Sequence, residues 1–344
     1  MSAITLLARF QQVGDLVDLN DGIIKFQKVL ALTPPGHPDR SSSLVNLANA
    51  LFMRFEQVGD LADFSNGIVK HQEALELTPP GDPRHFGSLL NLANALKIRF
   101  EQVGDRTDLN DAIIKYQEAL ELTPPGHPLR SISLLNLANA LKTRFEQVGD
   151  RTDLSDAITK YQETLELRPP GHPDRSISLS NLANALFTRF EQVGDRIDLY
   201  DAIIKYQEAL ELRPPGHRLR SSSLLGLATA LLARFEQTKN QADLNDSIIK
   251  YQESLELRSL GHPLRVNSLL SLADALKTRF EEAGDRADLD DAIIKHQEAL
   301  ELTPPGHPLH SRCLRTLALA LSVRLEGIDI GESRCAKAFQ FVDQ

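Results

Sequence analysis

The chain has 344 residues, of which 42% are hydrophobic and 25% charged, and its formal net charge is −9. This composition is typical of a soluble folded protein, and the acidic balance disfavours general binding to nucleic acid. No apolar run approaches the roughly 20 residues of a membrane span, and Met1–Arg9 lacks the regions of a secretory signal. We therefore predict a cytoplasmic protein, with the nucleus not excluded, that binds neither nucleic acid nor membranes.

Self-similarity dominates the chain. A segment of the form Arg-Phe-Glu-Gln-Val-Gly-Asp recurs every 45 residues, and we number its copies 1 to 7 by their phenylalanine. These residues are Phe10, Phe55, Phe100, Phe145, Phe190, Phe235 and Phe280, with Leu325 at the next step. Because no insertion breaks this spacing, each copy is expected to stack on the next in the same way.

The ends of the array are irregular. Met1 aligns with Asn46, so copy 1 opens inside its first helix, and the register dissolves after Glu326. We predict a solenoid over residues 1–326 and a divergent tail over residues 327–344. Neither end reads as the polar cap that repeat arrays need, so we predict a chain that is a fragment or that can self-associate through uncapped ends.

Each copy is predicted to hold two helices, which we call helix A and helix B. In copy 4, helix A is expected to begin at His127–Pro128 and to end at Gly149. Its predicted apolar face holds Leu134, Leu137, Ala138, Leu141, Phe145 and Val148. Helix B is expected to start at Asp153 as its N-cap and to end before the Pro-Pro-Gly segment. Strand-type alternation is missing, which predicts an all-α fold.

These motifs resemble the tetratricopeptide repeat (TPR). The matching segments in copy 4 are 136–141, 149–150, 156–158, 161–167 and Pro169. The family places a small residue in helix A, and the corresponding column here is Ala48, Ala93, Ala138, Ala183, Ala228, Ala273 and Ala318. HEAT and armadillo arrays have similar periods, but the motif columns favour TPR. The family's usual repeat has 34 residues, so the 45-residue copies imply a longer hairpin.

The resemblance implies a right-handed superhelical solenoid of antiparallel helix pairs that binds a peptide or protein in a concave groove lined by helix A. Two asparagine columns are the candidate binding residues, because an amide can pair with the backbone of any extended peptide. The first column is Asn46, Asn91, Asn136 and Asn181. The second column, three residues on, is Asn49, Asn94, Asn139 and Asn184. The alternative is that these residues only satisfy neighbouring repeats.

A third column varies among the near-identical copies and contains Phe52, Lys97, Lys142, Phe187, Leu232, Lys277 and Ser322. This variation indicates either specificity, with Lys97 and Lys142 in the groove, or drift on a solvated face. A basic column that includes Arg40, His85 and Arg130 indicates either an acidic partner or pairing with acids such as Glu118 and Glu121.

A row of histidines precedes helix A in Gly-His-Pro segments, with Asp82 in place of one of them. We interpret the row as a helix-start feature, because one histidine per repeat leaves about 10 Å between neighbours, too far to share a metal ion. The two cysteines, Cys313 and Cys335, form neither a disulfide framework nor a zinc site. We predict no metal and no cofactor.

No catalytic arrangement stands out from the repeats, so we predict a non-enzymatic scaffold whose partner is a protein or peptide. The array also resembles the long-period repeats found beside caspase-like CHAT domains. That likeness favours a second hypothesis, in which the chain is a regulatory or sensor segment of a larger protein.

Overall fold

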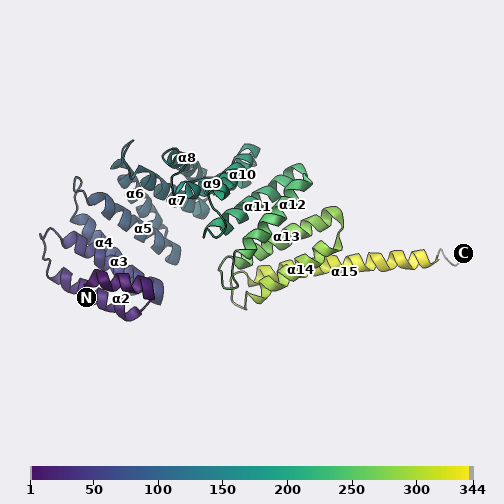
Figure 1. Cartoon of the computed structure of the whole chain (residues 1–344), viewed down its shortest axis with the longest axis horizontal. Coiled ribbons are helices and arrows are strands. Elements are labelled where there is room, and N and C mark those ends of the chain that lie inside the picture. The colour runs from purple at the N-terminus through teal and green to yellow at the C-terminus, as the bar shows by residue number, and fades with distance from the viewer. Residues whose placement is uncertain (1, 341–344) are drawn as a thin grey trace. The chain divides into compact units, whose positions relative to one another are not determined.

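The computed structural model describes residues 2–340, with side chains for residues 2–325. It divides into two compact units, Met1–Pro169 and Pro170–Gln344, which are described separately here. Within the described residues all regular structure is helical. In each unit the helices form antiparallel pairs in chain order (Figure 1). This arrangement confirms the prediction of an all-α repeat fold.

Odd-numbered helices correspond to helix A of each copy. They are α1 (Ala3–Val13), α3 (Arg40–Val58), α5 (His85–Val103), α7 (Arg130–Val148), α9 (Arg175–Val193), α11 (Arg220–Thr238), α13 (Arg265–Ala283) and α15 (His310–Gln340). Even-numbered helices correspond to helix B. They are α2 (Leu16–Ala31), α4 (Leu61–Glu76), α6 (Arg106–Glu121), α8 (Arg151–Glu166), α10 (Arg196–Glu211), α12 (Gln241–Glu256) and α14 (Arg286–Glu301).

The columns predicted to be apolar form the core. In copy 4, Leu134 and Ala138 are fully buried, and Leu141 is 4% exposed. Ala157 and Ile158 of α8 are buried as well. The alanine column allows helices to approach closely, because a larger side chain would hold the backbones apart. Val148, also predicted on this face, is 56% exposed near the end of α7, so the periodicity predicted the buried face correctly except at its last position.

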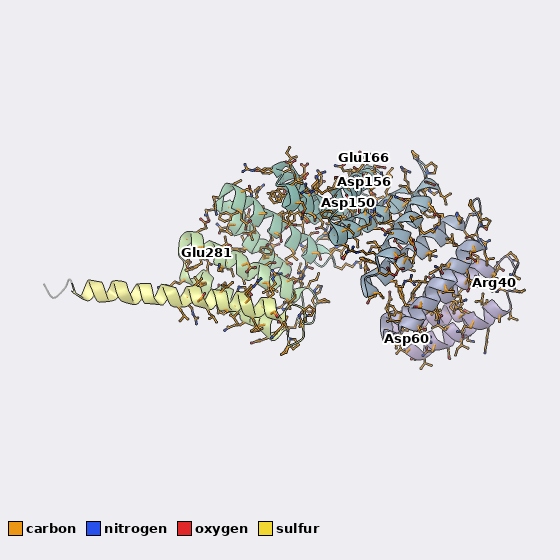
Figure 2. All side chains as sticks on the ribbon, turned by 180° about the vertical axis from the view of Figure 1, so that it is seen from behind. Arg40, Asp60, Asp150, Asp156, Glu166 and Glu281 are labelled. Atoms are coloured by element: carbon orange, nitrogen blue, oxygen red, sulfur yellow. The ribbon has the colours of Figure 1, made fainter. Side chains whose placement is uncertain are left out.

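Two residues turn the chain from helix A to helix B. Gly149 adopts the left-handed conformation with φ 79°, which glycine reaches without steric cost. Asp150 follows as the N-cap, and its carboxylate accepts a hydrogen bond of 2.9 Å from the Thr152 N–H. Figure 2 labels the cap residue Asp150 and, inside α8, Asp156. The prediction that Asp153 is the N-cap is thus wrong by three residues.

The predicted start of helix A at His127–Pro128 is also wrong. Residues 124–129 form turns, in which the Arg130 N–H donates to the His127 carbonyl at 3.0 Å, and α7 begins at Arg130. His127 nevertheless marks the helix start, because its Nδ1 accepts the Leu129 N–H at 3.1 Å. Asp82 performs the same task for the Arg84 N–H at 2.8 Å. These bonds order the turn that leads into helix A, but neither side chain caps the helix itself.

Copy 6 has Lys239-Asn240 in place of Gly-Asp, but the turn between its helices is kept. Lys239 occupies the left-handed position with φ 56°, and among the described residues it is the one non-glycine with positive φ. Asn240 is the N-cap and accepts from the Ala242 N–H. Asparagine thus supplies the cap, while lysine adopts the strained conformation.

In the last helix, α15, a position that is buried in other copies is exposed to solvent. Leu314 is 47% exposed, whereas its equivalent Leu269 in α13 is fully buried. The backbone of α15 continues as one helix through Glu326 to Gln340. The predicted domain boundary at residue 326 and the predicted self-association stay predictions. None of the described helices combines the length and apolar character needed to cross a membrane.

Candidate functional site

The first asparagine column lies on the solvent-accessible face of helix A. In the first unit, Asn46 is exposed on α3, while Asn91 on α5 and Asn136 on α7 are half-buried. The side-chain amides of these three residues make no hydrogen bond with another described residue. Their amide groups are consequently available to a ligand. Asn181 occupies the same position on α9 in the second unit.

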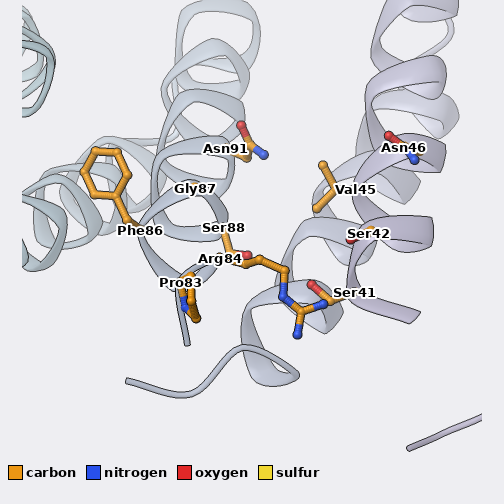
Figure 3. A pocket seen from close by; sticks show the side chains of 10 residues that line it. All are labelled: Ser41, Ser42, Val45, Asn46, Pro83, Arg84, Phe86, Gly87, Ser88 and Asn91. Atoms are coloured by element: carbon orange, nitrogen blue, oxygen red, sulfur yellow. The ribbon is translucent and has the colours of Figure 1, made fainter. Parts of the chain in front are cut away.

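A cavity of about 400 Å³ lies between α3 and α5, where their first turns come together. Asn46, Val45 and Ser42 line it from α3, and Asn91 and Gly87 line it from α5 (Figure 3). The cavity is open to solvent along this face of the first unit. Two residues of the predicted ladder therefore border a real cleft.

One charged side chain borders this cleft, and its charge is matched. The Arg84 guanidinium donates to the Asp82 carboxylate through Nη2 at 2.8 Å and through Nε at 3.0 Å. Its Nη1 donates to the Pro38 carbonyl at 2.8 Å. The hydrogen bonds from Arg84 lower the pKa of Asp82 to about 2. The cleft therefore has no unpaired charge among its lining residues.

The second asparagine column has an internal role. Asn94 Oδ1 accepts a hydrogen bond from the Tyr116 hydroxyl at 2.6 Å, and Asn139 Oδ1 accepts from Tyr161 at 2.7 Å. Asn184 makes the same contact with Tyr206. Each bond joins helix A to helix B of the same copy. Burial also raises the pKa of these tyrosine hydroxyls, so they stay protonated donors at neutral pH.

The helix B residue that faces the second asparagine column differs between copies. His71 stands in the tyrosine position opposite Asn49, and His296 stands opposite Asp274. The His296 Nε2 lies 3.9 Å from Asp274 Oδ1, and the Nδ1 of each histidine is buried without a hydrogen bond among the described residues. Burial lowers the pKa of both histidines to about 4.

Residues in the variable column contact their own repeat. Lys97 and Lys142 form ion pairs with Glu101 and Glu146 one helical turn later. Phe52 instead stacks on His71 with ring centroids 5.3 Å apart. These contacts give the column a packing role, and a role in specificity stays a prediction.

The basic column binds carbonyl groups at the end of the preceding helix B, and Arg130 also pairs with an acid. Arg130 Nη1 donates to the Thr123 carbonyl at 2.6 Å, and Arg40 Nη1 donates to Thr33 at 2.5 Å. Nearby acids are more distant, as the 3.6 Å approach of Arg130 to Glu163 shows. Pairing with a neighbouring acid is thus seen for Arg130, but the acid is Glu163 of α8 and not Glu118 or Glu121, and the carbonyls at the end of the preceding helix are closer acceptors.

Sequence reasoning missed the ion pair that recurs in every copy. Arg144 donates to both oxygens of Asp153, at 2.7 and 2.6 Å, and the Asp153 side chain is 6% exposed. The same geometry joins Arg54 to Asp63 and Arg279 to Asp288. The signal was present, because an arginine stands nine residues before each of these aspartates.

Other reactive side chains do not gather into a site. Among residues 2–325, no three His, Cys, Asp or Glu side chains come together in a way that could hold a metal ion. Cys313 is buried in α15 as a free thiol. The side chain of Cys335 lies outside the described residues.

Comparison with solved structures gives the fold. The C-terminal part of a TPR repeat-containing protein from Cytophaga hutchinsonii matches 92% of this chain over 99% of its own length, with 14% identity and a TM-score of 0.55. A tetratricopeptide repeat protein from Parabacteroides merdae matches 93% of this chain over 98% of its own length, with 11% identity and a TM-score of 0.54. No protein-family model and no curated protein matches the sequence. The chain therefore has the fold of TPR proteins, as its motifs predicted.

Proposed function

We propose that this chain is an interaction scaffold that binds an extended segment of another protein along the helix A face of its first unit. The cleft between α3 and α5 carries this proposal, because Asn46 and Asn91 border it with amide groups that have no partner among the described residues. An extended peptide offers unpaired backbone N–H and C=O groups, which such amides can both accept from and donate to.

The contrast between the two asparagine columns supports the proposal. Asn94 and Asn139 each accept a tyrosine hydroxyl, so their presence is explained by folding. Folding gives no comparable reason for Asn46, Asn91 and Asn136. We therefore assign peptide contact to the first column and a structural role within each copy to the second column, Asn49, Asn94, Asn139 and Asn184. Lys97 and Lys142 stay candidates for contact with the peptide.

Binding by the first column is testable with the full chain. A phage-displayed library of random 12-residue peptides would be selected on the wild-type protein, and the affinities of selected peptides would then be measured by fluorescence anisotropy. The variant Asn46→Ala/Asn91→Ala should weaken binding about tenfold or more, because two buried hydrogen bonds of about 1 kcal/mol each are lost.

The matched control is Asn94→Ala, which removes an asparagine of the second column. This variant should lower the thermal midpoint and leave peptide affinity within about twofold, since Asn94 acts through Tyr116. Unchanged affinity in the Asn46→Ala/Asn91→Ala variant, with helicity intact by circular dichroism, would contradict the proposal.

A further inference from the structure

One position on the α5 side of the cleft between α3 and α5 carries no side chain. Gly87 borders the cleft on α5, and a Cβ atom placed on Gly87 would meet nothing within 4 Å. Copies 4 and 5 carry Ile132 and Ile177 at the equivalent position. Ile132 is 39% exposed, and Ile177 is half-buried. An aliphatic side chain thus stands at this position in two copies, while Ser42, Ser222 and Asn267 stand there in copies 2, 6 and 7.

Nothing about the backbone requires glycine at this position. Gly87 lies in the first turn of α5, and its φ is not in the left-handed region. Glycine within a helix also lowers stability relative to other residues, because it loses more backbone freedom on folding. The absence of a side chain is therefore not explained by the fold.

The chemistry of the walls selects the kind of occupant. Val45 points into the gap from α3, and Arg84 extends across its lower edge with its charge matched by Asp82 (Figure 3). The Phe86 ring points away from α3 and lies 6.4 Å from the His127 ring. The Ser88 hydroxyl is already bonded to Thr78 at 3.1 Å. A charged occupant would lose its hydration without gaining a free counter-charge.

We infer that this cleft is a specificity pocket for one aliphatic side chain, Leu, Ile, Val or Met, of the extended peptide that the proposed function requires. The peptide supplies an aliphatic side chain of the kind that copies 4 and 5 carry at this position and copy 3 lacks. Asn46 and Asn91 border the pocket from opposite helices and bond the peptide backbone on either side of the anchored residue. A helical ligand fits less well, because its backbone groups are already bonded to one another.

The test replaces the missing side chain. Gly87→Ile inserts the residue that copies 4 and 5 carry, into a space that is open, so the fold is retained. The matched control is Ser222→Ile, which adds the same side chain at the equivalent exposed position of copy 6 in the second unit. Peptides selected from the random 12-residue library on the full wild-type chain are the probe.

Selected peptides are expected to share one aliphatic position. Gly87→Ile should weaken their binding about 10- to 100-fold, the range expected when a buried aliphatic side chain is displaced, and Ser222→Ile should change it less than about twofold. Replacing the shared aliphatic residue of the peptide by alanine should weaken binding to wild type, and should have little further effect on Gly87→Ile, because the two changes remove one contact.

The outcomes separate this inference from the proposed function on which it rests. Binding that survives Gly87→Ile but is lost in Asn46→Ala/Asn91→Ala would overturn the pocket and keep the asparagine surface. Selected peptides without a shared aliphatic position would overturn the pocket as well. No enrichment of any peptide on the wild-type chain would overturn both.

Discussion

Copy 4 in the first unit and copy 7 in the second have the same scaffold and differ at a buried polar contact between helix A and helix B. Both combine a 19-residue helix A with a 16-residue helix B, joined by a left-handed glycine. Both hold an arginine-aspartate pair with an Nη2–Oδ1 distance of 2.6 Å. Copy 4 then joins Tyr161 to Asn139, whereas copy 7 places His296 opposite Asp274.

This difference separates what the repeat needs from what it tolerates. The ion pair and the caps use charges and backbone groups that every copy must satisfy. The tyrosine position needs only a flat side chain that fills the space between the two helices. The replacement of tyrosine by histidine keeps the packing, but it exchanges a neutral hydrogen bond for two groups that titrate.

Removal of the shared ion pair should give the largest effect, and the same effect in both copies. Asp153→Ala and Asp288→Ala should each lower the free energy of unfolding by about 2 kcal/mol, because the arginine loses two charged hydrogen bonds but stays about one-third exposed. Urea titration followed by circular dichroism measures this change. Losses that differ by more than about 1 kcal/mol between the two variants would break the equivalence of the two copies.

The histidine should make copy 7 more sensitive to acid than copy 4. Burial lowers the pKa of His296 to about 4, while the unfolded chain keeps the ordinary value of 6.5. Between these values the unfolded state binds a proton that the folded state does not, so stability falls as the pH falls from about 6.5 to about 4. Burial also raises the pKa of Asp274, which acts in the opposite direction and reduces the net effect.

A reciprocal exchange tests this expectation. The variant His296→Tyr/Asp274→Asn recreates the pair of copy 4. Between pH 7 and pH 5, its free energy of unfolding should fall by on the order of 1–2 kcal/mol less than that of wild type. Tyr161→His/Asn139→Asp should add acid sensitivity to copy 4. Urea midpoints at the two pH values provide the measurement, and parallel pH profiles for wild type and both variants would refute the assignment.

The smallest expected effect concerns the turn between the helices. Lys239→Gly should stabilise copy 6 by about 0.5 kcal/mol, because the left-handed conformation costs a non-glycine residue about 1 kcal/mol. Part of this gain is offset by the loss of the exposed ion pair with Glu282 and of the contact over the Phe235 ring. Gly149→Lys is the converse change in copy 4 and should destabilise it. Thermal midpoints that move in the same direction for both variants would exclude strain at this turn.

Sequence periodicity predicted the helices, their buried faces and the TPR-like fold, because these depend on contacts that recur within each copy. Leu134 and Ala138 are examples, since their spacing alone places them on the buried face. The ends of the helices were less predictable. Asp150 and Asp153 are both acids near the start of helix B, and their spacing alone did not distinguish the cap from the ion-pair partner.

The candidate site shows the same division. The sequence by itself determined that two asparagines, three residues apart, share one face of helix A. Only the tertiary structure decided their roles, because the Tyr116 hydroxyl comes from another helix and reaches Asn94, while Asn91 is left beside the cleft. Periodicity fixes the direction of a side chain from its own helix, but the side chain that meets it depends on how the helices pack.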